Sequence, residues 1–231
     1  MSLWQFLLEN GNEVLSLTGQ HLWMVFVSVL IAAAIGIPAG VLMTRRPGLE
    51  KGILGFASVV QTIPSLALFG FLILVPIVGG IGASSAIVAL ILYALLPIVR
   101  NTFIGIRKVD PAIREAGLGM GMTDWKLLLQ VELPLSLGII LAGIRVAAIT
   151  SVGVATIAAA IGAGGLGVYI FRGVASVNTT LILAGAIPAA LLALLMDFGL
   201  NQLERYLSPP GANQEVRGDS ARRGNAKGVV S

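Results

Sequence analysis

Few side chains in this chain are of types that perform covalent or metal chemistry. The 231 residues include no cysteine and a single histidine, His21. Thiolate nucleophiles, disulfides and histidine-based zinc sites are therefore excluded. No GxxxxGK[ST] phosphate-binding loop occurs, and no serine, histidine and carboxylate residues collect in one place as a catalytic constellation. We expect a chain that is not an enzyme and that binds no metal or cofactor itself.

One pattern matches a cofactor motif letter for letter. Gly162, Gly164 and Gly167 have the GxGxxG spacing of the dinucleotide-binding fingerprint. That fingerprint needs a strand before it and an acidic residue about twenty residues later. Around position 185 the sequence is Leu-Ala-Gly-Ala-Ile, and the first acid is Asp197. We interpret the glycines as a turn or a close approach of helices.

The amino-acid composition indicates the type of secondary structure and the surroundings in which any functional residue must lie. Hydrophobic residues make up 56% of the chain and charged residues 11%, with a mean hydropathy of +0.93. A soluble domain carries about a quarter charged residues. Lipid must therefore surround much of this chain, and we expect one all-α integral membrane domain with about five spans. The expected spans are Leu22–Met43, Ile53–Val78, Ser84–Ile106, Leu133 to just before Gly162, and Val177–Leu200.

Lysine and arginine fall in alternate connections, which predicts the orientation of the spans. The N-terminus is expected outside, and the loop at 107–132 and the C-terminal tail in the cytoplasm. Residues 1–20 contain no basic residue, so we interpret them as an extracytoplasmic segment rather than a signal peptide. We expect residues 21–207 to form the membrane domain and residues 208–231 a disordered, basic cytoplasmic tail. The basic residues that set this orientation are Arg45, Arg46, Lys51, Arg107, Lys108, Arg114, Lys126, Arg205, Arg217, Arg222, Arg223 and Lys227.

The expected cytoplasmic loop contains a short helix. Asp110 is a good N-cap and Pro111 suits the first helical position, whereas three glycines limit the helix to about three turns. Thr123 and Asp124 can cap a second helix that runs towards the membrane. Apolar residues would lie exposed on the first helix, and a protein partner with a groove would cover them. The alternative is an interfacial loop without a partner.

The same loop resembles the EAA loop of ABC importer permeases. Glu115-Ala116-Gly117 is followed by Gly121 six residues after Glu115, and by Leu133-Pro134, whose proline is nineteen residues after it. The chain departs from the pattern at Gly117, where a second alanine is usual. The resemblance implies a type I ABC importer permease fold whose coupling helix docks into a separate ATPase, the subunit that would bind ATP. It assigns the coupling role to Asp110, Pro111, Ile113, Glu115, Ala116, Gly117, Leu118, Gly121, Leu133 and Pro134.

In that family, Glu115 would hold the shape of the loop by capping or pairing, and Gly121 would permit the turn that follows. Other stretches are similar to the glycine betaine, choline and carnitine branch, namely QTIPS at 61–65, YALLPIVRNT at 93–102, GMGMT at 119–123, AGIR at 142–145 and ATIAAAIGAGGLG at 155–167. This resemblance implies a plasma-membrane permease that carries a quaternary-ammonium osmoprotectant by alternating access. Its expected partners are the ATPase, an extracytoplasmic solute-binding protein and a second permease chain, with no nucleic acid.

Three alternatives stay open from the sequence. The solute could be another small molecule such as an amino acid, or the chain could be a structural membrane subunit. A secondary transporter is disfavoured, because we find no clear internal repeat and no acidic residue in the middle of a span. Aromatic residues are 6% of the chain and do not cluster as a cage for a quaternary ammonium group, which fits recognition by a separate binding protein.

Polar residues within the spans are candidates for the translocation path. Gln61 and Thr62 lie beside Pro64, which frees a backbone carbonyl, so they could line a path or hydrogen-bond between helices. Arg145 lies eleven residues after Pro134, ~17 Å along a regular helix. It is a gate or pairing residue, or the helix extends into the cytoplasm and Arg145 lies at a shallower depth. We favour the interpretation in which the helix extends into the cytoplasm and Arg145 lies at a shallower depth.

Overall fold

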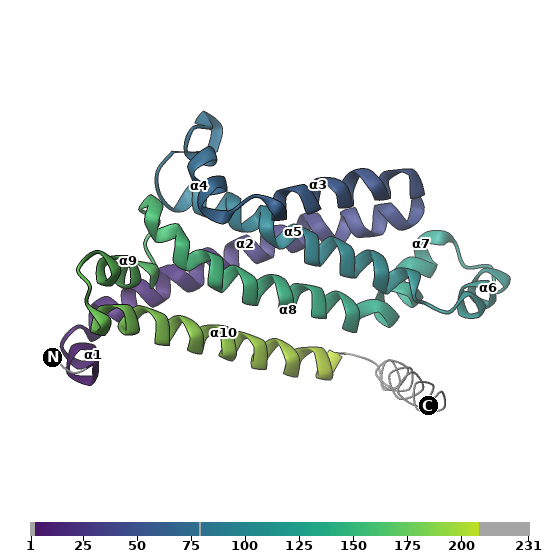
Figure 1. Ribbon diagram of the computed structural model, residues 1–231. Coiled ribbons are helices and arrows are strands. Elements are labelled where there is room, and N and C mark those ends of the chain that lie inside the picture. The colour runs from purple at the N-terminus through teal and green to yellow at the C-terminus, as the bar shows by residue number, and fades with distance from the viewer. Residues whose placement is uncertain (1–2, 79, 208–231) are drawn as a thin grey trace, which may run out of the picture.

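The computed structural model describes residues 3–78 and 80–207, and within these ranges the chain forms helices and no strands (Figure 1). The residues 208–231 of the expected cytoplasmic tail lie outside the described ranges. The elements are α1 (Leu3–Glu9), α2 (Gly11–Arg45), η1 (Pro47–Leu49), α3 (Glu50–Thr62), α4 (Ser65–Ile73), η2 (Pro76–Val78), α5 (Ala83–Arg107), α6 (Pro111–Gly119), α7 (Asp124–Leu127), the π turn η3 (Leu128–Glu132), α8 (Leu133–Ile157), η4 (Ala158–Ile161), α9 (Gly167–Ala175) and α10 (Thr179–Leu207).

Within the described ranges, four long helices can cross a membrane, because each combines a long apolar run with backbone hydrogen bonds made inside the helix. They are α2, α5, α10 and the helical stretch Asp124–Ile161 that contains α8. In Figure 1 these helices lie side by side, with α5 packed against α2 and α8, and α10 packed against α8. Helix α2 is longer than the uncharged run from Leu22, because it begins at Gly11.

The second predicted span, Ile53–Val78, is bent rather than straight. The chain bends by 100° between helices α3 and α4. The break follows from Pro64, which forces the preceding Ile63 into an extended conformation (φ −71°, ψ 127°) and ends α3 at Thr62. If the bent pair is one span, the described chain has five, in agreement with the prediction of about five.

Small residues set the distances between the long helices. A Cβ atom on Gly40 of α2 would lie 2.6 Å from Cβ of Thr102 on α5. A Cβ atom on Gly143 of α8 would lie 2.6 Å from Cβ of Asn101 and 2.8 Å from the carbonyl oxygen of Pro97. Such close approach is typical of helices packed in membranes, where dispersion contacts replace the hydrophobic effect.

The glycine cluster after α8 is a turn, as the sequence analysis predicts. Helical residues precede it, and Gly162, Gly164 and Gly165 all have positive φ (74°, 83° and 76°). The backbone N–H of Gly165 donates a hydrogen bond of 3.2 Å to the side-chain oxygen of Gln20 on α2. The turn therefore reverses the chain into α9, which lies at the opposite end of the bundle from α6 (Figure 1).

We expect Gly143→Ala to destabilise the bundle and Gly153→Ala to leave it intact. Both glycines lie in α8, but nothing lies within 4 Å of a Cβ atom at Gly153. The added methyl group at Gly143 has to displace backbone, which costs about 1–3 kcal/mol. Thermal unfolding in detergent, followed by tryptophan fluorescence, measures both. Equal melting temperatures for the two variants would contradict this close approach of α8 and α5.

Candidate functional site

Helices α6 and α7 form one end of the molecule, at the right of Figure 1. Asp110 caps α6, since its Oδ1 accepts a hydrogen bond of 2.8 Å from the N–H of Ala112. Pro111 occupies the first turn, where its missing N–H is not needed. Thr123 caps α7 with a longer bond of 3.4 Å from the N–H of Lys126. The two predicted caps are therefore confirmed.

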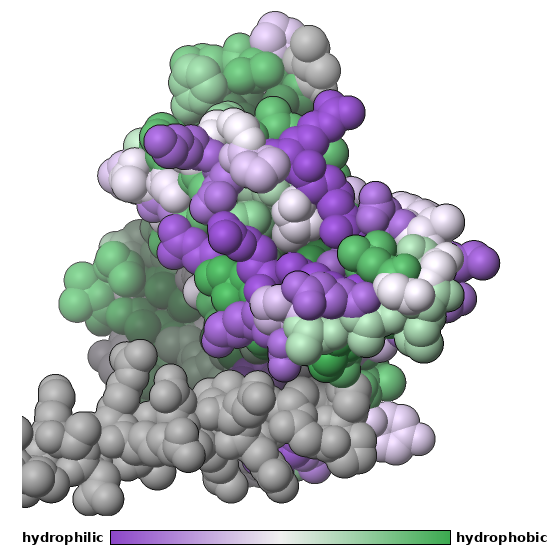
Figure 2. Space-filling view, turned by 90° about the vertical axis from the view of Figure 1, so that its right-hand side faces the viewer, coloured by the Kyte–Doolittle hydropathy of each residue, from purple (hydrophilic) through white to green (hydrophobic). Residues whose placement is uncertain are grey.

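The predicted apolar face of α6 is exposed. Ile113, Ala116 and Leu118 lie on the surface, and Met120 just after the helix is 77% exposed. Trp125 of α7 is exposed beside them along the chain. Figure 2 looks onto this end of the molecule, and hydrophilic residues cover most of it, with apolar areas among them. Exposed large apolar side chains on a short helix are typical of a docking element.

Two glycines determine how α6 is held. Gly121 has φ of 80°, a conformation that glycine adopts without strain, and the turn there leads into α7. Gly117 is buried, and a Cβ atom there would lie 2.7 Å from Cδ1 of Leu127. Gly117, where the chain departs from the usual Glu-Ala-Ala pattern, thus lies where α6 packs against α7, and an alanine there would require the Leu127 side chain to shift.

Glu115 does not have the predicted capping or pairing role. Its side chain is exposed, and it makes no hydrogen bond or ion pair to any other residue in the described ranges. The cap belongs to Asp110, and the pairing residue of α6 is the adjacent Arg114. The Glu115 carboxylate is therefore free to contact another molecule.

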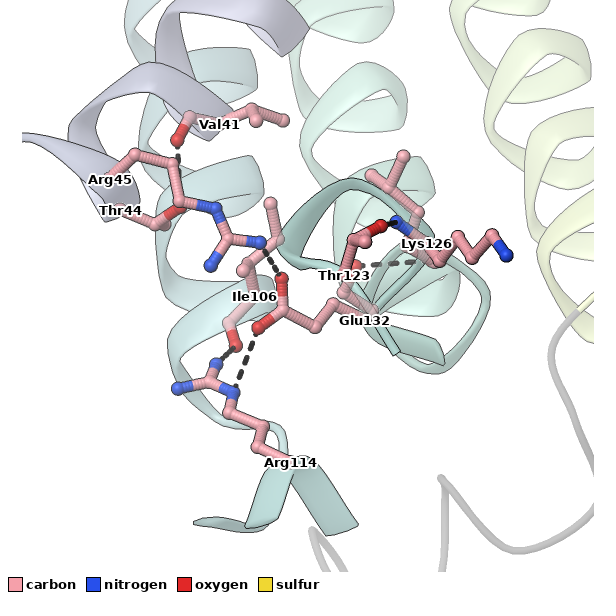
Figure 3. A network of polar contacts seen from close by, with 10 residues as sticks. Val41, Thr44, Arg45, Ile106, Arg114, Thr123, Lys126 and Glu132 are labelled. Atoms are coloured by element: carbon pink, nitrogen blue, oxygen red, sulfur yellow. Dashed lines mark hydrogen bonds and ion pairs between the residues drawn. The ribbon is translucent and has the colours of Figure 1, made fainter. Parts of the chain in front are cut away.

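Arg114 forms part of a buried ionic cluster centred on Glu132. The Glu132 side chain is 1% exposed, and its Oε2 accepts a hydrogen bond from the guanidinium of Arg45 at the end of α2. Its Oε1 lies 3.0 Å from Nε of Arg114, an ion pair whose angle falls outside that of a hydrogen bond. The Arg114 guanidinium also donates to the carbonyl of Ile106 on α5. Figure 3 shows the Glu132 carboxylate between the two arginines.

Glu132 lies on the buried stripe of its own helix. Leu128, Glu132, Ser136 and Ile140 are all buried and are spaced four residues apart. The wide π turn Leu128–Glu132 precedes Pro134, whose ring crowds the carbonyl four residues earlier in a regular helix. Leu133 and Pro134, which the resemblance singled out, are therefore the start of α8 just after the cluster.

Glu132 was not among the predicted site residues, although a signal was present. It is the single acidic residue between Asp124 and Asp197, and it lies in a mostly apolar stretch at the end of the predicted loop 107–132. A buried carboxylate needs positively charged or donor partners. The arginines that supply them are 87 and 18 residues away along the chain, so that spacing alone could not identify them.

The candidate path residues divide into two separate groups. Gln61, at the end of α3, donates a hydrogen bond of 2.9 Å to the carbonyl of Tyr93 on α5, and the Tyr93 hydroxyl donates to the carbonyl of Ile63. Thr62 donates within α3, to the carbonyl of Val59 at 2.7 Å. Both Gln61 and Thr62 are exposed beside the kink at Pro64, and the hydrogen bond of Gln61 also joins α3 to α5.

Arg145 lies elsewhere, between α8 and α10. Its Nε is 2.8 Å from Asp197, and its Nη1 is 3.3 Å from Glu204 and 3.1 Å from the side-chain oxygen of Asn201. Arg145 is therefore a pairing residue, and all these partners lie on α10. Two carboxylates and one guanidinium give this group a formal net negative charge.

We expect Asp110→Ala to loosen α6 and Asp110→Asn to preserve it. Loss of an N-cap costs roughly 1 kcal/mol, which corresponds to about fivefold faster exchange of the α6 amide hydrogens. Asparagine caps a helix about as effectively as aspartate does, so the Asp110→Asn variant keeps the capping hydrogen bond and removes only the negative charge. Hydrogen–deuterium exchange of peptides covering 111–119 measures the effect. Equal exchange in the alanine variant and the unmodified chain would contradict the capping role.

Comparisons with known proteins agree with this architecture. A carnitine transport permease protein of Listeria monocytogenes is 46% identical over 213 residues, covering 92% of this chain and 96% of its own length. An osmoprotectant import permease protein of Salmonella typhimurium is 45% identical over 89% of this chain and 97% of its own. A glycine betaine/carnitine/choline transport system permease protein of Bacillus subtilis is 43% identical over 89% of this chain and 94% of its own.

Solved structures share the fold. A chain of the MetNI methionine ABC transporter, in an inward-facing conformation, superposes with a TM-score of 0.75 at 28% identity, covering 82% of this chain and 94% of that one. A chain of an amino acid ABC transporter gives 0.73 at 19% identity, covering 87% and 97%. The model of the family "Binding-protein-dependent transport system inner membrane component" matches residues 18–209. The chain thus belongs to this family of multi-pass inner membrane transport components and has the type I ABC importer permease fold.

Proposed function

We propose that this chain is the membrane-spanning permease subunit of an ATP-driven importer for a quaternary-ammonium osmoprotectant, namely glycine betaine, choline or carnitine. The observation that carries the proposal is the likeness to osmoprotectant permeases at 43–46% identity over about nine-tenths of the chain. ATP would be hydrolysed by a separate ATPase subunit, because this sequence has no phosphate-binding loop.

The end of the bundle that carries α6 is assigned to the cytoplasm. Arg45, Arg107 and Lys108 all lie at helix ends there, as do the basic residues of α6 and α7. At the opposite end Arg172 pairs with Glu13 at 3.0 Å, so this end has little excess positive charge. The positive-inside tendency supports this orientation, with the N-terminal residues 1–20 outside.

Helix α6 is the proposed coupling helix. Its exposed apolar residues would enter a groove of the ATPase, and the unpaired Glu115 carboxylate would contact the partner rather than this chain. ATP binding would then bias two arrangements of the helix bundle through contacts made at α6. A second permease chain, identical or related, would complete the path across the membrane.

Solute recognition is assigned mainly to an extracytoplasmic binding protein that docks near α9. The 14 aromatic residues do not cluster along the sequence as a cage for a quaternary ammonium group, so the permease would supply a weakly selective path. The bent pair α3–α4, with Gln61, Thr62 and Pro64 at its kink, is the proposed moving part of that path. A hinge needs a few residues at an element end that absorb a change in backbone angles, and Ile63-Pro64 provides them.

Uptake into proteoliposomes tests the proposal. They would contain this chain, its ATPase and its binding protein, and they would be supplied with labelled glycine betaine, choline, carnitine and methionine. We expect ATP-dependent uptake of at least one of the first three. Uptake of methionine alone would show that the transported solute is an amino acid and not an osmoprotectant. Uptake that persists without ATP while ion gradients are clamped would contradict an ATP-driven importer.

Two substitutions test the role of the loop in the same vesicles. We expect Glu115→Ala and Gly121→Ala each to lower uptake at least tenfold, because one removes the free carboxylate and the other strains a residue at φ of 80°. Gly119→Ala is the matched control, since Gly119 is an ordinary helical residue with open space around it. Full uptake by both test variants would show that α6 does not couple ATP hydrolysis to transport.

A further inference from the structure

We propose that Glu132 is a positioning residue that locks α6 to spans α2 and α8, so that force applied at α6 moves those spans instead of rotating α6 alone. The inference rests on the proposed function, in which α6 receives the motion of an ATPase. It adds to that function a specific mechanical link, which neither the loop motif nor the relatives identify.

Helix α6 has little else to hold it. Gly117 is its only buried residue in the described ranges, and it packs against Leu127 of α7. The remaining tie is Arg114, whose guanidinium contacts both Glu132 and the carbonyl of Ile106. Without the charge at Glu132, Arg114 would keep its bond to the carbonyl of Ile106 on α5, but α6 would lose its tie to the end of α2 and the start of α8.

The same carboxylate reaches a second span. Its other oxygen binds Arg45 in the last turn of α2, while its own backbone begins α8. Three segments that are far apart in the sequence therefore meet at one group of atoms (Figure 3). Because α2 and α8 both pack against α5, a displacement of Glu132 is shared by the centre of the bundle.

Burial makes this link rigid. A carboxylate that is 1% exposed needs charged partners, and a change that separates it from either arginine removes one of the two ion pairs that offset its desolvation. Arg45 and Arg114 are 37% and 29% exposed, so each can reach water if the carboxylate is neutralised. The substitution Glu132→Gln should thus release the link while both arginines remain solvated.

An ion pair at the same end of the bundle provides a matched control. Glu50 of α3 lies 3.7 Å from Arg107 of α5, and both side chains are considerably more exposed than Glu132. An exposed pair of this kind contributes little to stability or geometry. Glu50→Gln makes the same chemical change without touching α6.

The absence of cysteine permits a direct measurement of geometry. Spin labels on Ala112→Cys in α6 and Gly48→Cys between α2 and α3 report the distance from α6 to the end of α2, and Gly48 has open space around it. We expect a narrow distance distribution in the labelled full-length chain and in Glu50→Gln. We expect the distribution to be at least twice as wide in Glu132→Gln and in Arg114→Gln.

The functional measurement uses the complete importer in proteoliposomes and compares solute taken up per ATP hydrolysed. We expect Glu132→Gln and Arg114→Gln to bind the ATPase as the unmodified chain does, yet to lower this ratio about tenfold. The double variant should lower the ratio less than the product of the two single losses, because each single variant already removes the ion pair between Glu132 and Arg114. If Glu132→Gln does not fold, Arg114→Gln alone still breaks the connection between α6 and α8.

An unchanged distance distribution in Glu132→Gln and Arg114→Gln would overturn the inference. So would an unchanged ratio of uptake to hydrolysis, or an equal loss in Glu50→Gln. Loss of ATPase binding in the two variants would assign the cluster to docking instead of positioning. If the unmodified importer takes up none of the quaternary ammonium compounds, the proposed function fails, whereas the spin-label distances still decide whether Glu132 positions α6.

Discussion

The Glu132 carboxylate, buried between the guanidinium groups of Arg45 and Arg114, is the interaction on which the α6 end of this protein depends. A buried carboxylate allows few arrangements, because each lost ion pair removes part of the interaction that offsets its desolvation. The cluster therefore fixes three helices relative to one another at the place where α6 leaves the bundle. We attribute the defined position of α6 to this charge and its two arginine partners.

Membrane solvation explains the remainder of the architecture. Each peptide group in the spans has to be satisfied inside the chain, which gives long helices and restricts breaks to residues with a specific cause. Pro64 causes the 100° bend between α3 and α4, and Pro134 accompanies the π turn before α8. Gly40 and Gly143 then let the helices approach closely enough to pack without a hydrophobic driving force between them.

Much of this fold could be predicted from the sequence, because it depends on local patterns. The apolar runs predict the spans, Asp110 and Thr123 predict the caps, and the glycines at 162–165 predict a turn. The contacts that join distant segments could not be predicted. Glu132 was included in the loop without a role, and the partners of Arg145 on α10, Asp197 and Glu204, were not predicted. Glu115 was given a capping or pairing role, whereas Arg114 makes the ion pair. Spacing along one helix does not contain such information.

The central claim is that α6 is the surface through which an ATPase drives this permease. Photocrosslinking from Leu118, replaced by a photoreactive phenylalanine derivative in cells that also make the ATPase, tests it most directly. We expect a crosslink to the ATPase from Leu118 and none from Val177, which lies at the opposite end of the bundle and is even more exposed, at 91% against 49%. A crosslink from Val177 and none from Leu118 would contradict both the docking surface and the assigned orientation.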